Sequence, residues 1–214
     1  MSFILRSLRG ILRRPPVVIF IVLALGSCLA GYGFVYWILS ANLHGDYLLL
    51  KNEYLEVEFP RYWFAFTWKP GNETSGRGYS AFFAPTDRYV VMLLRIYDEV
   101  ATRRFIEANN LTDAFSVAAY EADRMYNWSL QSNANATFLY SENGTVTVAS
   151  REAIYTKFAI RDGFKQDEAF YNLTCIFMSW IDKQQLFEIA FWGKEDDWTQ
   201  THSVFETMLG SIKI

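Results

Sequence analysis

Cysteine and histidine are scarce in this 214-residue sequence, with two of each. Cys28 stands inside a long apolar run, so Cys175 is the only cysteine in the rest of the chain and no disulfide can form there. His44 and His202 stand far apart, and neither H-E-x-x-H nor C-x-x-C occurs. These absences exclude a small disulfide-stapled module and argue against a zinc enzyme, so we expect no metal site.

Motifs of the common enzyme classes are also missing. The sequence contains no G-x-S-x-G, P-loop or G-x-G-x-x-G, so serine hydrolase, nucleotide and dinucleotide chemistry lack support. Glu195, Asp196 and Asp197 could form a cation site, but in the first turn of a helix they are explained by the helix dipole. Asp98 and Glu99 are expected as solvated edge charges. We therefore predict a non-enzymatic protein with no catalytic residue and no cofactor.

Acidic residues are absent from the first 45 positions. An uncharged apolar run of 23 residues occupies 17–39, and at about 1.5 Å per residue it makes a helix of roughly 34 Å. That length crosses a hydrocarbon core of about 30 Å. The basic residues before it predict a cytoplasmic N-terminus and an extracytoplasmic C-terminal part. These topology-setting residues are Arg6, Arg9, Arg13 and Arg14.

The run divides the chain into three expected parts. Residues 1–16 form a cytoplasmic basic segment, residues 17–42 a transmembrane helix, and residues 43–214 an extracytoplasmic domain. A cleaved signal peptide is disfavoured because its apolar region usually spans about 7–15 residues. A lipobox ending at Cys28 is disfavoured because apolar residues continue after it, although lipidation of Cys28 stays open. The expected location is the cell membrane, with a single pass.

The expected outer domain is acidic and rich in glycosylation motifs. It carries 16 basic and 23 acidic residues, a formal charge of −7, which argues against nucleic acid as a partner. Six Asn-x-Ser/Thr sequons lie in it, all on the side that the charge rule places outside. Their excess favours a glycoprotein. The candidate sites are Asn72, Asn110, Asn127, Asn135, Asn143 and Asn172.

Aromatic residues make up 18% of the chain. The stretch 62–68 alone contains five, more than one buried strand face requires. We expect about half of the rings to pack in the core and the rest to form an exposed patch, typical of an interface. The candidate interface aromatics are Tyr62, Trp63, Trp68, Trp180 and Trp192.

Hydrophobic periodicity gives the order of elements in the outer domain. Residues 43–51 are expected as a lead-out without regular structure. Asn143-Gly144 predicts a tight hairpin turn, residues 161–163 predict another turn, and Thr112 and Asp113 are candidate helix caps. Strands are expected at 53–59, 62–68, 79–83, 89–97, 136–140, 145–148, 151–160, 169–180 and 186–192, with helices at 110–130 and 195–209. An antiparallel sheet with helices packed on it follows from this order.

Two segments resemble the PsbP/Mog1-like families. Leu-Glu-Val-Glu-Phe-Pro-Arg-Tyr-Trp at 55–63 is similar to their early strand–Pro–x–x–Trp element. The ending is similar too, with an aromatic strand at 186–192, Glu-Asp-Asp-Trp at 195–198 and a helix reaching Phe-Glu-Thr-Met-Leu-Gly-Ser-Ile at 205–212. The resemblance covers about residues 50–214. It implies an α-β-α sandwich and a non-enzymatic binding or assembly role, but it transfers no ligand residue.

Together these features predict an α/β (α+β) fold. It is an α-β-α sandwich with a central, mainly antiparallel sheet, preceded by one N-terminal transmembrane helix. The expected function is that of an extracytoplasmic binding domain, an accessory or assembly subunit of a membrane or envelope protein complex. The expected partners are the lipid bilayer and other membrane or envelope proteins. The alternative is a cell-surface hydrolase or a carbohydrate- or ligand-binding ectodomain.

Overall fold

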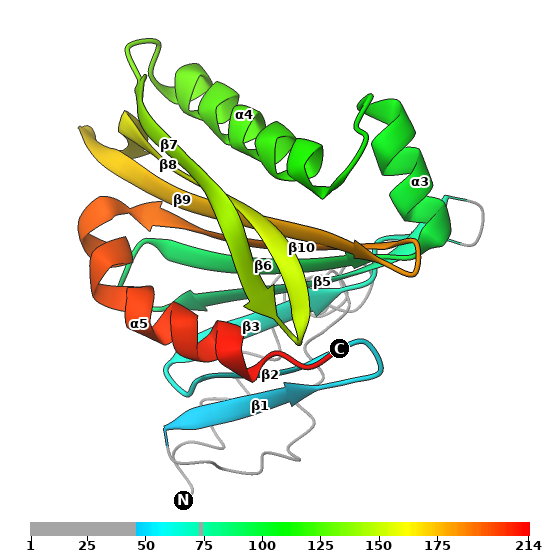
Figure 1. The fold of residues 1–214 in the computed structure, drawn as a ribbon. Helices are drawn as coiled ribbons and strands as arrows, with labels where there is room; N and C mark the ends of the chain where they lie inside the picture. The colour runs from blue at the N-terminus through cyan, green and yellow to red at the C-terminus, as the bar shows by residue number, and fades with distance from the viewer. Residues whose placement is uncertain (1–45, 73–74) are drawn as a thin grey trace, which may run out of the picture. The chain divides into compact units, whose positions relative to one another are not determined.

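A large antiparallel sheet organises the part of the chain that the structure describes (Figure 1). The structure is a computed structural model that describes residues 46–72 and 75–214, within the chain's second structural unit, Trp37–Ile214. The expected cytoplasmic segment, its four arginines and the expected transmembrane helix at 17–42 lie outside the described residues. Within them, no helix is long and apolar enough to cross a membrane.

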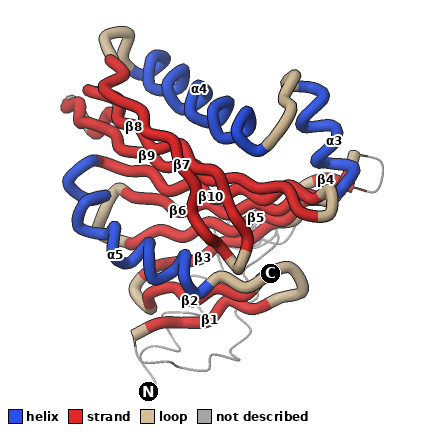
Figure 2. The backbone as a smooth tube through the Cα atoms, viewed as in Figure 1, coloured by secondary structure: helices blue, strands red, loops and turns tan. Residues whose placement is uncertain are grey.

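Seven strands of the sheet follow one another in the order β3-β5-β6-β10-β9-β8-β7, and β4 pairs with β5. Every pairing is antiparallel. A separate two-stranded sheet joins β1 to β2. Figure 2 distinguishes these strands from the helices. The strands are β1 Tyr47–Lys51, β2 Glu56–Pro60, β3 Trp63–Trp68, β4 Gly71–Asn72, β5 Gly76–Pro85, β6 Val90–Tyr97, β7 Thr137–Val148, β8 Arg151–Gln166, β9 Ala169–Asp182 and β10 Gln185–Lys194.

Helices lie on both faces of the large sheet (Figure 1). Helices α3 (Glu99–Ala108) and α4 (Ala114–Ser132) lie on one face, which we call the α4 face. Helix α5 (Glu195–Ser211) and the β1–β2 hairpin cover the other, the α5 face. The prediction of a central antiparallel sheet that carries helices is therefore confirmed for the described residues.

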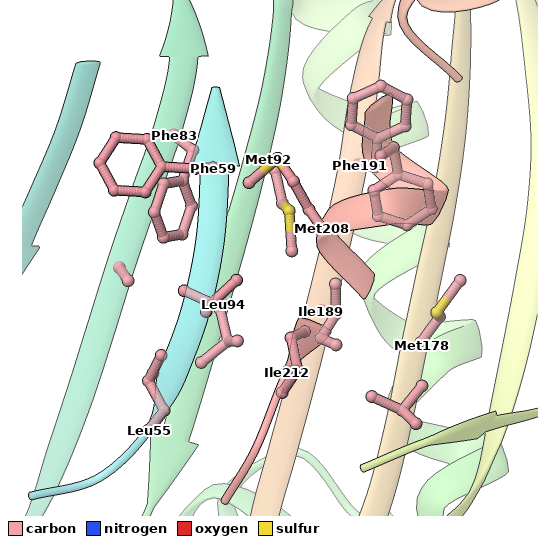
Figure 3. Packing of buried hydrophobic residues seen from close by; sticks show 14 of the residues in the cluster. Leu55, Phe59, Phe83, Met92, Leu94, Met178, Ile189, Phe191, Met208 and Ile212 are labelled. Carbon is pink, nitrogen blue, oxygen red and sulfur yellow. The ribbon is translucent and has the colours of Figure 1, made fainter. Parts of the chain in front are cut away.

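The α5 face holds the larger apolar core (Figure 3). Phe191 of β10 stacks on Phe205 of α5 with ring centroids 4.4 Å apart, and both side chains are buried. Met208 fills the space beside them, and Phe59 of β2 packs on Phe83 of β5. Because β2 and α5 close over the sheet together, this face is sealed along most of its length.

Local sequence signals account for the two predicted helices. Asp113 caps α4 by accepting a hydrogen bond from the Ser116 amide, and the Ser116 hydroxyl accepts one in return from the Asp113 amide, which completes a capping box. Glu195, Asp196 and Asp197 occupy the first turn of α5, where the helix dipole favours negative charge. Both helices extend slightly beyond their predicted C-terminal ends, and α4 begins at Ala114 instead of at residue 110.

The predicted hairpin turn at Asn143-Gly144 is wrong. Strand β7 runs through both residues, and the chain reverses at Ala149 and Ser150, which have φ of 49° and 62°. Gly144 is needed for packing, because a Cβ there would lie 2.7 Å from the ring of Tyr155 on β8. The Asn-Gly pair thus makes room for a cross-strand ring.

Three further elements differ from the sequence prediction. Residues 47–51, expected as an irregular lead-out, form β1 against β2. The predicted turn at 161–163 is an irregularity inside β8, where the register to β9 shifts between Ile160 and Phe164. Helix α3 was not predicted. Asp98, expected as a solvated edge charge, is its N-cap and accepts from the Ala101 amide at 2.8 Å.

Candidate functional site

Helices leave part of the α4 face open in the described structure. Helix α4 packs mainly on β8 and β9, and α3 packs at one end of β5, β6 and β10. Beside them, β3, β5, β6 and β10 carry apolar side chains that are half-buried or exposed. We call this set the aromatic surface; it comprises Phe64, Phe66, Trp68, Phe82, Val91 and Trp192.

Strand register brings the aromatic surface together from distant parts of the sequence. Phe66 pairs with Phe82, Phe82 with Leu93, and Leu93 with Ala190, so these residues form one row across four strands. Directly paired residues of antiparallel strands point to the same sheet face. Phe64 and Phe82 also contact each other, with ring centroids 5.6 Å apart. The surface is therefore built on rigid paired strands.

A pocket of about 290 Å³ lies between this surface and helix α4. Its floor comes from β6, β9 and β10, and its far wall from α4. The volume is close to the lower end of the range of about 300–1,000 Å³ that is usual for small-molecule sites. The lining residues are Leu93, Arg95, Glu121, Arg124, Met125, Trp128, Phe177, Ala190 and Trp192.

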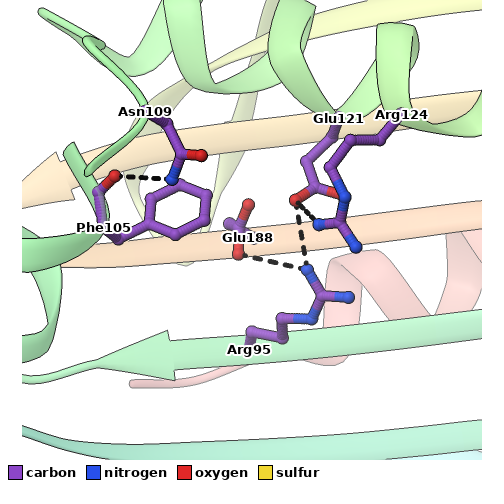
Figure 4. Close-up of polar contacts among 6 residues, drawn as sticks. All are labelled: Arg95, Phe105, Asn109, Glu121, Arg124 and Glu188. Atoms are coloured by element: carbon purple, nitrogen blue, oxygen red, sulfur yellow. Dashed lines mark hydrogen bonds and ion pairs between the residues drawn. The ribbon is translucent and has the colours of Figure 1, made fainter. Parts of the chain in front are cut away.

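Four charged side chains form a cluster beside and beneath this pocket (Figure 4). We call it the Arg95 cluster: Arg95 of β6, Glu188 of β10, and Glu121 and Arg124 of α4. Arg124 donates to Glu121 at 2.6 Å, and Arg95 donates to the same carboxylate oxygen at 3.4 Å. The contact with Glu121 links the sheet to α4, and Arg95 also forms an ion pair of 3.6 Å with Glu188 on the neighbouring strand.

Glu188 is the least satisfied member of the Arg95 cluster. Its side chain is only 7% exposed, and neither carboxylate oxygen has a hydrogen bond of good geometry, although the Arg95 guanidinium and the Tyr97 hydroxyl lie beside it. Burial raises its pKa to about 7, Arg95 opposes that rise, and the charge on Glu121 adds to it. Burial likewise raises the pKa of the neighbouring Tyr97 hydroxyl. A buried acceptor without a donor is costly, so Glu188 favours either a proton or a donor from outside.

The predicted interface aromatics divide between core and surface. Trp63 and Trp180 are buried on the α5 face. Tyr62 is 58% exposed in the turn that precedes β3. Trp68 and Trp192 are half-buried on the α4 face. The interface prediction therefore stays with these last three residues, and Phe64 and Phe66 join them from the same strand.

The predicted glycosylation sites differ in accessibility. Asn72 is the last residue of β4. Asn172 is half-buried, and its side-chain amide donates to Glu195 at 2.8 Å while its oxygen accepts from the Asp162 amide at 3.3 Å. The remaining four sites lie in exposed positions, and we expect them to be better acceptors than Asn172. They are Asn110, Asn127, Asn135 and Asn143.

The sequence signals for metal or thiol chemistry do not converge in the described residues. Between 46 and 72 and between 75 and 214, no three His, Cys, Asp or Glu side chains are grouped to hold a metal ion. Cys175 is fully buried, and burial raises the pKa of its thiol. His202 packs on Trp198 with ring centroids 4.5 Å apart. These positions are explained by packing.

The sequence reasoning missed the Arg95 cluster. A signal was present, because Arg95 and Glu188 are single charges inside otherwise apolar strand segments, Val-Val-Met-Leu-Leu-Arg-Ile and Leu-Phe-Glu-Ile-Ala-Phe. Opposite charges that interrupt two buried strands indicate that the strands pair at those positions. Glu121 gave a weaker signal, since acidic residues are common on helices.

Comparisons with known proteins reveal similarity in structure alone. No protein-family model matches the chain, and no curated protein matches its sequence. The structure is similar to cyanobacterial PsbP (CyanoP) from Synechocystis sp. PCC 6803, with 12% identity and a TM-score of 0.48, over 87% of this chain and 99% of that one. It is also similar to a Pseudomonas aeruginosa protein of unknown function, with 10% identity and a TM-score of 0.31, over 76% and 92% of the two chains. Both similarities concern the course of the backbone at low identity, and no residue role is carried over from either protein.

Proposed function

We propose that this protein is a single-pass membrane protein whose extracytoplasmic domain binds another protein, as an accessory or assembly subunit of a membrane or envelope complex. The observation that carries the proposal is the aromatic surface beside α4. Soluble domains rarely leave large apolar side chains together on a sheet face, and such patches mark interaction sites. Phe64, 46% exposed, lies on β3, which is an edge strand of the sheet.

The proposed membrane location rests on the sequence before the described residues. The uncharged run at 17–39 follows four arginines, and the sequons all come after it. A domain that is anchored in the same membrane as its partner diffuses only along that membrane. Because this tethering raises the effective concentration of the two proteins, a modest apolar surface is sufficient for association. An accessory role without catalysis is consistent with the absence of any enzyme motif in the sequence.

Crosslinking of native membranes tests the proposal directly. The wild-type protein, crosslinked and purified, is expected to carry a partner protein in a fixed ratio. Phe64→Asp places a charge at the exposed β3 side of the aromatic surface and is expected to reduce the recovered partner at least about tenfold, a loss of about 1.4 kcal/mol or more in binding free energy. Phe115→Asp is the matched control, because Phe115 is 45% exposed on α4 outside the surface. A wild-type protein that stays monomeric under mild detergent would contradict the proposal.

Glycosidase treatment tests the orientation. Membrane preparations from a eukaryotic expression host should show a mobility shift that treatment removes, because the sequons would face the lumen. Asn135→Gln should reduce the shift by one glycan, whereas Asn172→Gln should leave it unchanged because that side chain is bonded on both sides. A protein without any shift would argue for the opposite orientation or for empty sequons, and protease accessibility of intact vesicles separates these two outcomes.

A second candidate function is ligand binding by the same domain. The pocket beside α4 supports it, because two carboxylates, Glu121 and Glu188, converge there on Arg95. Because Glu121 is paired with the guanidinium groups of Arg95 and Arg124, its role is structural more than that of a general acid or base. Binding is therefore favoured over hydrolysis at this pocket.

A further inference from the structure

The pocket beside α4 has aromatic walls that favour a cation. Trp128 of α4 stands at the rim with 44% of its surface exposed, and Trp192 of β10 and Phe177 of β9 line the floor. Faces of tryptophan and phenylalanine rings attract ammonium groups through the ring quadrupole, by about 0.5–2 kcal/mol for each contact. The same walls also accept an apolar body of any charge, so they do not define the ligand alone.

A second, smaller cavity leads toward Glu188. It measures about 10 Å³, enough for roughly one water molecule or one ammonium group. Five of its six lining residues also line the larger pocket, so the two cavities adjoin. The sixth is Glu188, and the shared five are Leu93, Arg95, Glu121, Phe177 and Ala190.

Of the two carboxylates at this junction, only Glu188 has incomplete hydrogen bonding. Arg124 and Arg95 both donate to Glu121, which satisfies that carboxylate. The Glu188 side chain, 7% exposed, has Arg95 at 3.6 Å and the Tyr97 hydroxyl beside it, but neither of its oxygens has a hydrogen bond of good geometry. An anionic ligand at this junction would meet the negative charges of Glu121 and Glu188. A ligand that brings a donor displaces nothing.

We propose that the pocket binds a primary amine carried on an apolar body about the size of a phenyl ring, with the ammonium group beside Glu188 and the body between Trp128 and Trp192. The ammonium supplies the hydrogen bonds that Glu188 lacks and offsets its charge. The body displaces water from the aromatic walls. This site deepens the ligand-binding role proposed above for the pocket. It shares Trp192 with the aromatic surface, but Phe64 does not line the pocket, so the Phe64 and Glu188 variants test the two proposals separately.

Binding to the wild-type full-length protein in mild detergent tests the site. The probes are 2-phenylethylamine, the uncharged 2-phenylethanol and the anionic 3-phenylpropionate, titrated by calorimetry. The amine should bind at least about tenfold more tightly than the alcohol, and the anion should bind more weakly than both. Equal affinity for amine and alcohol, or no heat from the amine at millimolar concentration, would overturn the proposal and leave Glu188 with a trapped water.

The affinity for the amine should depend on pH through Glu188. The other groups that face it are Arg95 and Tyr97 from β6 and Glu121 from α4, and Ser179 lies opposite on β9. Its pKa is raised to about 7, so the carboxylate fraction, and with it the amine affinity, should rise about tenfold between pH 6 and pH 8. The affinity for the alcohol should not follow this change.

Three variants separate the site from general effects. Glu188→Gln keeps the shape but removes the charge, so it should abolish both the preference for the amine and its pH dependence. Glu152→Gln, at an exposed position of β8, should leave both unchanged. Trp128→Ala truncates a rim residue whose side chain is 44% exposed, and it should weaken amine binding severalfold while the pH dependence persists. Amine binding that survives Glu188→Gln at full strength would overturn the proposal.

Discussion

The two faces of the central sheet are packed in different ways. On the α5 face, helix α5 and the β1–β2 hairpin cover a continuous apolar core whose largest side chains are fully buried. On the α4 face, helix α4 covers the outer strands, and a charged cluster, a pocket and the aromatic surface occupy the remainder. This difference predicts that substitutions on the α5 face reduce stability more than substitutions on the open part of the α4 face.

Charge follows the same division. On the α5 side, Glu56 bonds Lys51 at 2.7 Å and Lys213 at 2.6 Å at the solvent edge, which lowers the pKa of Glu56 to about 2. On the α4 face, burial raises the pKa of Glu188 to about 7. One carboxylate is stabilised as an anion by its hydrogen-bonded lysines, and the other is held where an anion is disfavoured. The two faces are therefore expected to respond oppositely to pH.

The largest effect is expected from a cavity on the α5 face. Phe191→Ala removes a fully buried ring that stacks on Phe205, so it should lower the free energy of unfolding by about 3–5 kcal/mol. Denaturant unfolding of the purified protein measures this. Phe64→Ala on the aromatic surface is the comparison and should cost less than about 1 kcal/mol. Similar losses for both variants would remove the distinction between the faces.

A smaller loss is expected when the Arg95 cluster is broken. Glu121→Ala leaves Arg95 beside Glu188 alone and deprives Arg124 of its partner at 2.6 Å. Removing one partner of a buried ion pair should cost about 2–4 kcal/mol here, since both arginines keep some contact with water. Glu121→Leu tests whether charge or volume matters. A leucine variant as stable as the wild type would show that the cluster serves binding more than folding.

The smallest effect concerns pH. Glu188 has a pKa near 7 in the folded protein and an ordinary value of 4.5, so the folded state holds this proton more tightly than the unfolded state. Its contribution to stability is therefore present below pH 4.5 and is lost as the pH rises toward 7, by on the order of 1–3 kcal/mol. Glu56 acts in the other direction, because its stabilisation is lost as the pH falls from 4.5 toward 2.

Unfolding measured from pH 3 to pH 8 distinguishes the two carboxylates. Glu188→Gln should remove the decline between pH 4.5 and pH 7 and leave the acid side unchanged. Glu56→Gln should do the reverse. If Glu188→Gln leaves the decline in place, another group carries the proton, and the contrast between the faces does not extend to titration.

Periodicity predicted most of the strands and two helices, because those elements are specified by their own residues. Asp113 and Ser116 form a local capping box, and the buried strand at 90–97 shows as an apolar run. Elements defined by distant partners were missed or misplaced. β1 exists because β2 pairs with it, and Gly144 serves a ring eleven residues further along. Helix α3 is only ten residues long, and its one buried residue, Thr102, is polar, so no buried apolar face marks it in the sequence.

The candidate site was only partly predictable for the same reason. The excess of aromatics at 62–68 indicated a surface, but the sequence could not assign Trp63 to the core and Phe64 to solvent, since either phase of the alternation fits. The Arg95 cluster depends on the pairing of β6 with β10, which are separated by more than eighty residues. Composition gives no information on such a pairing.

The pairing of Arg95 with Glu188 also has a consequence for how the chain folds. These residues are direct Cα partners between β6 and β10, and every neighbour on those strands for two residues either way is uncharged. A slip of two residues would keep the sheet faces correct but place Glu188 opposite Leu93 or Tyr97, leaving two unmatched charges in an apolar layer. The ion pair thus raises the free energy of misaligned pairings between these two strands, which lie far apart in the sequence.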